Sequence, residues 1–458
     1  MCDEWRKMFQ EPGWVGSFNL CSGSLPLIVT TSNHFLWSPM LQLTGLSVVG
    51  YRSFAQPLEF ELRPLTLLYG RNNAGKSAVL RLLPIIADSV ADGAASPFDI
   101  ARVTGTDASF LDALARGSSQ SERKRLDLTL NWSDGSGGGW QDEYQLKYID
   151  EADRTVITAL TILDTVGSLH FTAKAQPYPD HLQYLNGSNG PGSSEAMIEP
   201  GFMGLVPSPD SGVDTLNELR RRLLSLRHKI QWLKSVRARW DRLVTKTGSD
   251  HLLLESDGTY AAEAMLTDDA IFDEVRRWYA GPDIRRQLEK SEFARRWRIL
   301  LNPPAGDLRD IDLLDTGEGM IQVLPVLVAC AQARQRGCGS ILAIEEPESH
   351  LHANAQQALA AHLSEIAAAP TSPTIIAETH SRILLLGIQL AIAEGRLPPE
   401  RCCIYWIDQE ATGESVLSKV EFDQHGRPTG GWPQTAFDED QVLARRLLDR
   451  QMQGGAFG

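Results

Sequence analysis

The amino-acid sequence predicts an α/β fold in which one sheet is built from two separated stretches of the chain. Three observations support this. A short apolar run at Leu65–Tyr69 leads through a glycine-rich turn into a segment with helical spacing. Beyond residue 305, apolar runs alternate with helical segments, which is typical of a parallel sheet covered on both faces. Between the two stretches, the pattern becomes antiparallel and then helical and basic.

Length, charge and cysteine content set the broad class. A chain of 458 residues is long enough for two or three domains with a sizeable core. Its 44 Lys and Arg against 58 Asp and Glu give a net charge of -14, which argues against a protein that coats nucleic acid. The six cysteines form no CxxC pair, so we expect reduced thiols and a cytoplasmic protein. No stretch reaches the ~18–20 apolar residues of a membrane span, so no membrane partner is expected.

We expect five regions along the chain. Residues 1–39 lack clear periodicity, and one interpretation is that translation starts at Met40 and that 1–39 is a disordered or mis-annotated extension. The others are a first lobe at 40–175, a basic helical insertion at 176–304, a second lobe at 305–400 and a small C-terminal domain at 401–458.

The elements of the first lobe follow from periodicity. Strands are predicted at 41–49, 58–62 and 65–69, followed by a helix over 78–89. A second group of β-rich runs, joined by a glycine-rich hairpin loop at 134–139, reads as antiparallel and covers 126–132, 144–149, 156–163 and 169–172.

The second lobe alternates regularly between helix and strand. Helices are predicted at 323–331, 353–366 and 383–394, and strands at 341–344, 374–377 and 403–407.

A phosphate-binding loop is the strongest motif. Gly70–Ser77 fits the pattern G-x-x-x-x-G-K-[ST], in which backbone N–H groups wrap a phosphate. Lys76 is expected to reach the β- and γ-phosphates of ATP, Ser77 to supply an oxygen to Mg²⁺, and the following helix to point its positive end at the anion. A chance glycine-rich turn is the alternative, but a buried strand before the loop and an amphipathic helix after it are the context that the motif requires. The residues expected to contact ATP here are Gly70, Arg71, Asn72, Asn73, Ala74, Gly75, Lys76, Ser77 and Ala78.

Asn73 stands where related loops often carry glycine. Asparagine tolerates a positive φ better than most residues, so this position is compatible with the loop.

Two further strand ends carry candidate catalytic groups. The apolar run before Glu345 is expected to deliver that carboxylate to the sheet edge as a Mg²⁺ ligand, with Glu346 facing the attacking water. A charged strand terminus is the alternative interpretation. The run Thr374–Ser381 repeats the design and places His380 to bond a γ-phosphate or the water, although a lone histidine there would more often be structural.

On these motifs the chain resembles the RecF/OLD-type ABC ATPases, a group that includes the SMC and DNA-repair heads. More narrowly, it is similar to bacterial stand-alone ATPases with a short C-terminal domain of unknown function. The resemblance covers about 41–440 and rests on Gly70–Ser77, Glu345–His352, Glu378–Ser381, Asp315–Pro325 and Glu421–Arg427. It implies an ABC-type P-loop NTPase head, split by a β segment and a helical insertion.

The resemblance also implies a head-to-tail homodimer. In related heads, the signature of one subunit closes over ATP held by the other, so Gly317 and Gly319 would present N–H groups to the γ-phosphate in trans. Glu318 then places a carboxylate near a phosphate, which is unfavourable unless it points away. A simple glycine-rich helix start is the alternative.

The insertion concentrates positive charge. Ten Lys or Arg lie between Leu216 and Lys246, and eight lie between Val275 and Arg298. Contact with DNA or RNA is one interpretation, and solvated helix faces or an acidic partner are the other.

The leading functional prediction is an ATPase whose hydrolysis opens and closes a dimer. The second is a nucleotide-gated scaffold that scarcely hydrolyses ATP and holds a separate effector protein in check, as its resemblance to ATPase subunits of anti-phage defence systems implies. An OLD-type nuclease would need a metal-binding domain after Ser381, and no such acidic cluster follows. A transporter ATPase is disfavoured by the unusual signature.

Overall fold

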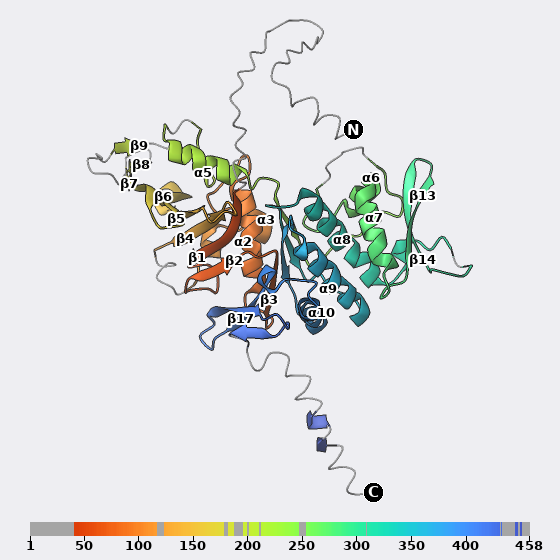
Figure 1. Cartoon of the computed structure of the whole chain (residues 1–458). Coiled ribbons are helices and arrows are strands. Elements are labelled where there is room, and N and C mark those ends of the chain that lie inside the picture. Colours follow the sequence, from red (N-terminus) through yellow and green to blue (C-terminus); the bar gives the residue numbers. More distant parts are fainter. Residues whose placement is uncertain are drawn as a thin grey trace, which may run out of the picture. The chain divides into compact units, whose positions relative to one another are not determined.

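A computed structural model of the chain (Figure 1) describes residues 41–116, 123–177, 182–186, 196–198, 201–209, 212–246, 253–307, 309–430, 432, 445–447 and 449–450. The predicted extension 1–39 lies outside these residues. The described residues belong to one compact unit, Pro39–Gly458. No helix among them is both long and apolar enough to cross a membrane.

The first sheet is antiparallel and has the strand order β2-β1-β4-β5-β6-β7-β8-β9. Alternation in the sequence gives it one buried face, as in β4, where every second residue is buried. Its strands are β1 (Gln42–Val49), β2 (Leu58–Glu61), β4 (Arg125–Ser133), β5 (Gly139–Ile149), β6 (Arg154–Asp164), β7 (Leu169–Pro177), β8 (Leu182–Asn186) and β9 (Ala196–Ile198).

The second sheet is mixed and carries the predicted site motifs, in the order β12-β15-β16-β3-β17-β18-β19. The first five strands in this order are parallel, and β18 and β19 are antiparallel additions. The strands are β3 (Leu65–Gly70), β12 (Ile230–Leu233), β15 (Ile341–Glu345), β16 (Thr374–Glu378), β17 (Cys402–Gln409), β18 (Ser415–Phe422) and β19 (Pro428–Gly430). Because carboxyl ends of parallel strands meet at one edge, β3, β15 and β16 bring their terminal residues together there.

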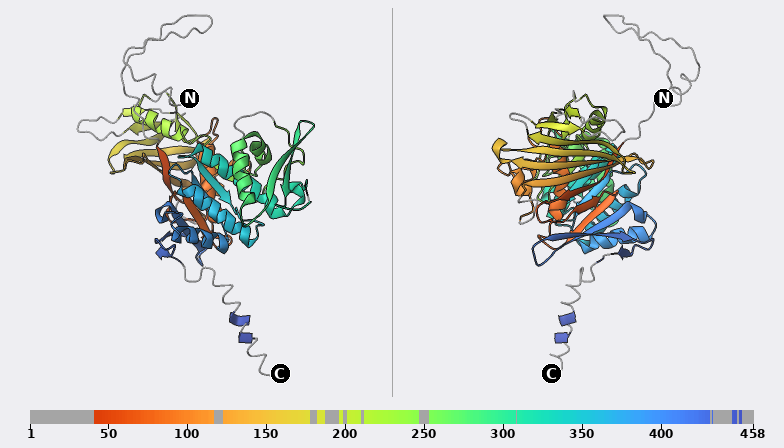
Figure 2. Two further views of the ribbon diagram at one scale, coloured as in Figure 1. Left: turned by 45° about the vertical axis from the view of Figure 1, so that its right-hand side comes forward. Right: turned by 90° about the vertical axis from the view of Figure 1, so that its left-hand side faces the viewer.

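Helices cover both faces of the mixed sheet, as Figures 1 and 2 show. Helix α2 (Lys76–Ser89) packs between the two sheets, in a core that takes Ile341 and Ala343 from β15. The alternate residues Leu342 and Ile344 face the other core, which α8, α9 and α10 share with α6 and α7. The remaining helices are α3 (Ala101–Thr104), α5 (Asp214–Leu224), α6 (Ala261–Thr267), α7 (Asp269–Ala280), α8 (Glu318–Arg336), α9 (Ala353–Ala368) and α10 (Arg382–Ala393).

Smaller elements complete the chain. Strands β10 (Phe202–Met203) and β11 (Val206–Pro207) form one hairpin, and β13 (Gln287–Phe293) and β14 (Arg296–Asn302) form another. Within the described residues, short 3₁₀ turns lie at Phe110–Ala113, Asp150–Ala152, Leu313–Asp315 and Pro399–Arg401.

The α/β fold and the two-lobed sheet agree with the prediction, but the insertion is less helical than expected. Strand β12 lies inside the predicted insertion 176–304, yet it pairs with β15 as a strand of the main sheet, and β13–β14 is a hairpin. Likewise, β17 and β18 of the predicted C-terminal domain 401–458 belong to that same sheet. A parallel strand that is buried on both faces needs only a short apolar run. When such a run lies inside a stretch with helical spacing, the sequence pattern does not distinguish it from part of a helix.

Candidate functional site

The glycine-rich loop joins β3 to α2 and adopts backbone angles that few residues accept. Gly70 has φ +148, and a Cβ at this position would lie 2.0 Å from the carbonyl oxygen of Ile407 on the neighbouring β17. Gly75, the N-cap of α2, has φ 105 and leaves the first N–H groups of the helix without a side-chain cap. Asn73 has φ 64, so the prediction of a positive φ there is confirmed. The loop therefore leads into a helix N-terminus that has no side-chain cap, an arrangement that can bind a phosphate.

Lys76 reaches back over this loop. Its Nζ donates to the carbonyl oxygens of Gly70 at 3.1 Å and Arg71 at 2.8 Å. The residue is only 3% exposed, and burial lowers the pKa of its ammonium group, while Glu378 and Glu346 oppose that shift. A cation thus stands where the phosphates of a nucleotide on the loop would lie.

Ser77 is hydrogen-bonded to Glu378, a glutamate to which the sequence motifs assign no individual role. Ser77 Oγ donates to Glu378 Oε1 at 2.8 Å, and the buried second oxygen, Oε2, has no partner among the described residues. Burial raises the pKa of Glu378 to about 7, with the Ser77 bond opposing and the Glu345 charge adding to the rise. A hydroxyl and a carboxylate with a free oxygen fit Mg²⁺, which binds oxygen ligands and takes few from the protein when phosphates supply the rest.

Glu345 lies next to Glu378, because β15 and β16 pair with these two residues in register. However, Arg81 holds both of its carboxylate oxygens, at 2.6 and 3.0 Å, and Trp232 Nε1 donates to Oε1 at 3.2 Å. The structure therefore places Glu345 where it was expected but leaves Glu378 as the acid with a free oxygen beside Ser77.

Glu346 and His380 follow directly after these strand ends. Glu346 has the left-handed φ of 43, its N–H donates to Glu378 O at 2.8 Å, and its Oε2 accepts from Ser349 Oγ at 2.9 Å. Burial lowers the pKa of His380, as does the charge of Lys76, while Glu346 raises it. These effects together favour the neutral form of the His380 imidazole over the charged form.

A buried carboxylate fixes the backbone at His380. Glu348 Oε1 accepts from Thr379 Oγ1 at 2.7 Å and from the His380 N–H at 2.9 Å. Glu348 therefore holds the backbone at Thr379 and His380 in place.

The two signature glycines differ in their surroundings. Gly317 is the N-cap of α8, and a Cβ there would meet open space. At Gly319 a Cβ would lie 2.4 Å from the carbonyl oxygen of His350, so this glycine permits close packing against the backbone after Glu346. Between them, Glu318 is paired with Arg239 and accepts from Gln322 at 2.8 Å, so its charge is balanced within the chain.

A cleft of about 840 Å³ opens beside the loop. Lys76, Ser77 and Glu378 line it, together with residues that the sequence analysis did not single out: Arg52, Arg81, Arg116 and Gln409. No motif marks these positions, because each comes from a different segment.

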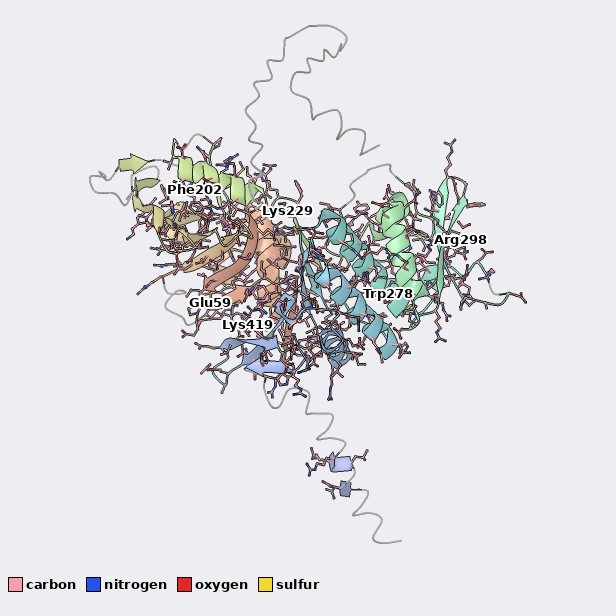
Figure 3. The ribbon with its side chains drawn as sticks, viewed as in Figure 1. Glu59, Phe202, Lys229, Trp278, Arg298 and Lys419 are labelled. Carbon is pink, nitrogen blue, oxygen red and sulfur yellow. The ribbon has the colours of Figure 1, made fainter. Side chains whose placement is uncertain are left out.

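Several basic residues of the insertion are paired with acidic residues within the chain. Arg298 on β14 (labelled in Figure 3) donates to Asp312 at 3.3 Å. Other pairs of the two basic runs are Arg222–Asp142, Arg227–Asp92, Arg239–Glu318, Arg242–Asp315 and Lys290–Asp269. These pairs balance part of the positive charge of the two basic runs.

Comparison with known proteins bears on the class. Residues 219–387 match the sequence model of a family described as "AAA domain, putative AbiEii toxin, Type IV TA system". This stretch, less than half of the chain, includes Glu345, Glu346 and His380 but not the phosphate loop. The match and the strand–loop–helix arrangement support a P-loop ATPase of the AAA or ABC type. The comparison with curated proteins gave no match.

Two solved structures are similar in chain path. The SMC head domain from Thermotoga maritima has a TM-score of 0.38 and 12% identity over 83% of this chain and 99% of that one. The Smc head domain bound to the C-terminal domain of ScpA from Pyrococcus furiosus has a TM-score of 0.42 and 11% identity, over 83% and 97%.

Proposed function

We propose that this protein binds ATP and hydrolyses it with Mg²⁺, as an ATPase of the RecF/OLD/SMC-like ABC class. The observation that carries the proposal is the meeting of four groups at one sheet edge: Lys76, the Ser77–Glu378 pair, Glu346 and His380. They come from three parallel strand ends that are far apart in the sequence.

Each group has a role that its geometry supports. The loop N–H groups and Lys76 hold the β- and γ-phosphates, and Ser77 with Glu378 would hold Mg²⁺. When bound, the cation would draw charge from the phosphate oxygens. Glu346 accepts a proton from the attacking water, and the neutral His380 donates a hydrogen bond to the γ-phosphate.

The test is ATP hydrolysis by the wild type beside Glu346→Gln. We expect hydrolysis by the wild type and a loss of at least about 100-fold in the variant, since general-base catalysis contributes about 10²–10⁴-fold. Equal rates in both proteins would refute the assignment of Glu346. No hydrolysis by the wild type, despite ATP binding, would favour the second candidate below.

We also propose a head-to-tail homodimer closed by ATP, in which Gly317 and Gly319 approach the partner's nucleotide. The pairing of Glu318 with Arg239 supports it, because the carboxylate at this helix start is already balanced. Light scattering of Glu346→Gln with ATP should give twice the monomer mass. Adding Lys76→Ala to that variant should return the mass of the monomer, and an unchanged monomer in both would contradict the dimer.

The biological output is gating of DNA or of a separate effector, in DNA repair or phage defence within the cytoplasm. The second candidate, a nucleotide-gated scaffold that restrains a partner toxin or nuclease, is favoured by the toxin–antitoxin description of the matching family. Hydrolysis measured with and without double-stranded DNA separates these outputs. Stimulation supports DNA gating, whereas indifference to DNA favours a protein effector.

A further inference from the structure

One segment of the insertion contacts two separate parts of the candidate site. This segment, Lys234–Lys246, follows β12 and has almost no regular secondary structure. Backbone bonds fix it at three points: Lys234 N–H to Ser256 O at 2.7 Å, Ala238 N–H to Asp257 O at 2.7 Å, and Val244 N–H to Trp297 O at 2.9 Å. We call it the arginine strap, because three arginines at 237, 239 and 242 make its long-range contacts.

Arg237 reaches the catalytic strand end. Its Nη2 donates to the carbonyl oxygens of Glu345 at 2.7 Å and Glu346 at 3.0 Å. The residue is 5% exposed, and its Nε and Nη1 have no partner among the described residues. Burial lowers the pKa of the guanidinium to about 10, with Glu348, Glu346 and Glu345 opposing, so it stays charged near neutral pH.

The contact falls where the backbone is strained. Glu346 has φ 43, a conformation that a non-glycine residue keeps only when its surroundings hold it there. Its N–H is held by Glu378 O and its carbonyl by Arg237, so both peptide groups of Glu346 are fixed from outside its own strand. Because the backbone sets the direction of the side chain, the bond from Arg237 to this carbonyl oxygen bears on where the carboxylate of Glu346 points.

The same strap holds the beginning of α8. Arg239 pairs with Glu318, the first residue of the helix. Arg242 makes a two-point contact with Asp315 at 2.6 and 2.7 Å and lies 3.2 Å from Asp312. The strap therefore binds the proposed catalytic glutamate and the proposed dimer-contact helix through neighbouring arginines.

We infer that Arg237 is the positioning residue of Glu346, and that the arginine strap couples the placement of the α8 N-terminus to it. This rests on the proposed hydrolysis at Glu346.

The test compares Arg237→Met with wild type in ATP hydrolysis and ATP binding. A misplaced catalytic group can cost about 100-fold in rate, so we expect kcat to fall by about 10- to 100-fold while KM and the ATP Kd change less than about 2-fold. Arg237→Lys, which keeps the charge and one donor, should recover part of the rate. Arg221→Met, which removes an exposed arginine of α5, is the control and should keep the wild-type rate.

A double variant separates positioning from general destabilisation. Once Glu346→Gln has removed the base, adding Arg237→Met should cost little more in kcat. Full additivity of the two losses, or a wild-type rate in Arg237→Met, would overturn the inference while leaving the ATPase itself intact.

Hydrogen exchange gives a readout that does not depend on hydrolysis. Arg237→Met should speed amide exchange in the peptide that contains residues 345–349, and Arg239→Gln should do so at 315–318, whereas Arg221→Met should change neither. If the wild type shows no hydrolysis but the exchange pattern appears, the proposed function fails and the positioning contact stands. Unchanged exchange in Arg237→Met overturns the inference.

Discussion

The buried ion pair between Arg222 and Asp142 gives a quantitative test of the packing. Arg222 on α5 donates to Asp142 on β5 at 2.6 and 3.3 Å, and the side chains are 2% and 0% exposed. Trp132 Nε1 adds a bond of 2.7 Å to the same carboxylate. Breaking a buried pair from one side costs ~3–5 kcal/mol, because the remaining charge is buried without its partner. We therefore expect Arg222→Met to lower the free energy of unfolding by about 3–5 kcal/mol.

Urea unfolding followed by tryptophan fluorescence measures this loss. The neighbouring Arg221 is the matched control, since it is 74% exposed and lies 3.8 Å from Glu218. Arg221→Met removes the same charge and should change stability by less than about 0.5 kcal/mol. Adding Asp142→Asn to Arg222→Met should restore part of the stability. If Arg222→Met lowers the free energy of unfolding by less than about 1 kcal/mol, the reasoning is refuted, because Arg222 would then not stabilise the buried Asp142 carboxylate.

Two further predictions concern the loop and a buried histidine. Gly70→Ala forces a Cβ to within 2.0 Å of Ile407 O, so it should abolish ATP binding and lower the unfolding midpoint. The control Gly167→Ala, at φ +79 with open space around it, should lower the free energy of unfolding by only about 1–2 kcal/mol. Equal effects of the two substitutions in unfolding and binding assays would contradict this prediction. Burial lowers the pKa of His362 to about 4. The unfolded state therefore takes up the proton first, and stability present above pH ~6.5 is lost as the pH falls toward 4. Between pH 7.5 and 5.5, the free energy of unfolding of the wild type, measured in urea, should fall by about 1.4 kcal/mol more than that of His362→Gln. The nearby Glu274, whose pKa is raised by burial, is present in both proteins. Equal losses in the two proteins would refute the assignment to His362.

The local motifs of the sequence predicted the parallel strands and the strand–loop–helix turn at Gly70–Ser77 well. Leu65–Gly70, Ile341–Glu345 and Thr374–Glu378 are short apolar runs that end in a glycine or a glutamate, so periodicity and turn chemistry define them without tertiary information. The positive φ at Asn73 followed from residue preference in the same way.

The features that the sequence alone does not reveal share a physical cause, which is dependence on distant partners. The four residues of β12 lie in a basic stretch with helical spacing, and only pairing with β15 makes them a strand. Whether Glu345 or Glu378 has a free oxygen depends on Arg81, a helix residue 264 positions away from Glu345. The acidic partners of several basic residues, such as Asp142 and Asp312, lie elsewhere in the chain, so the local sequence does not show which of the positive charges are paired.

Equilibrium binding of Mg²⁺·ATP tests the central claim, that the loop at Gly70–Ser77 holds the nucleotide through Lys76. Calorimetry would compare wild type with Lys76→Ala and with Lys147→Ala, which removes an exposed lysine on β5. Hydrogen bonds from a charged group contribute ~1.5–3 kcal/mol, so Lys76→Ala should weaken binding by about 10- to 100-fold. Lys147→Ala should bind like the wild type. Wild-type affinity in Lys76→Ala, or no binding by the wild type, would contradict the account.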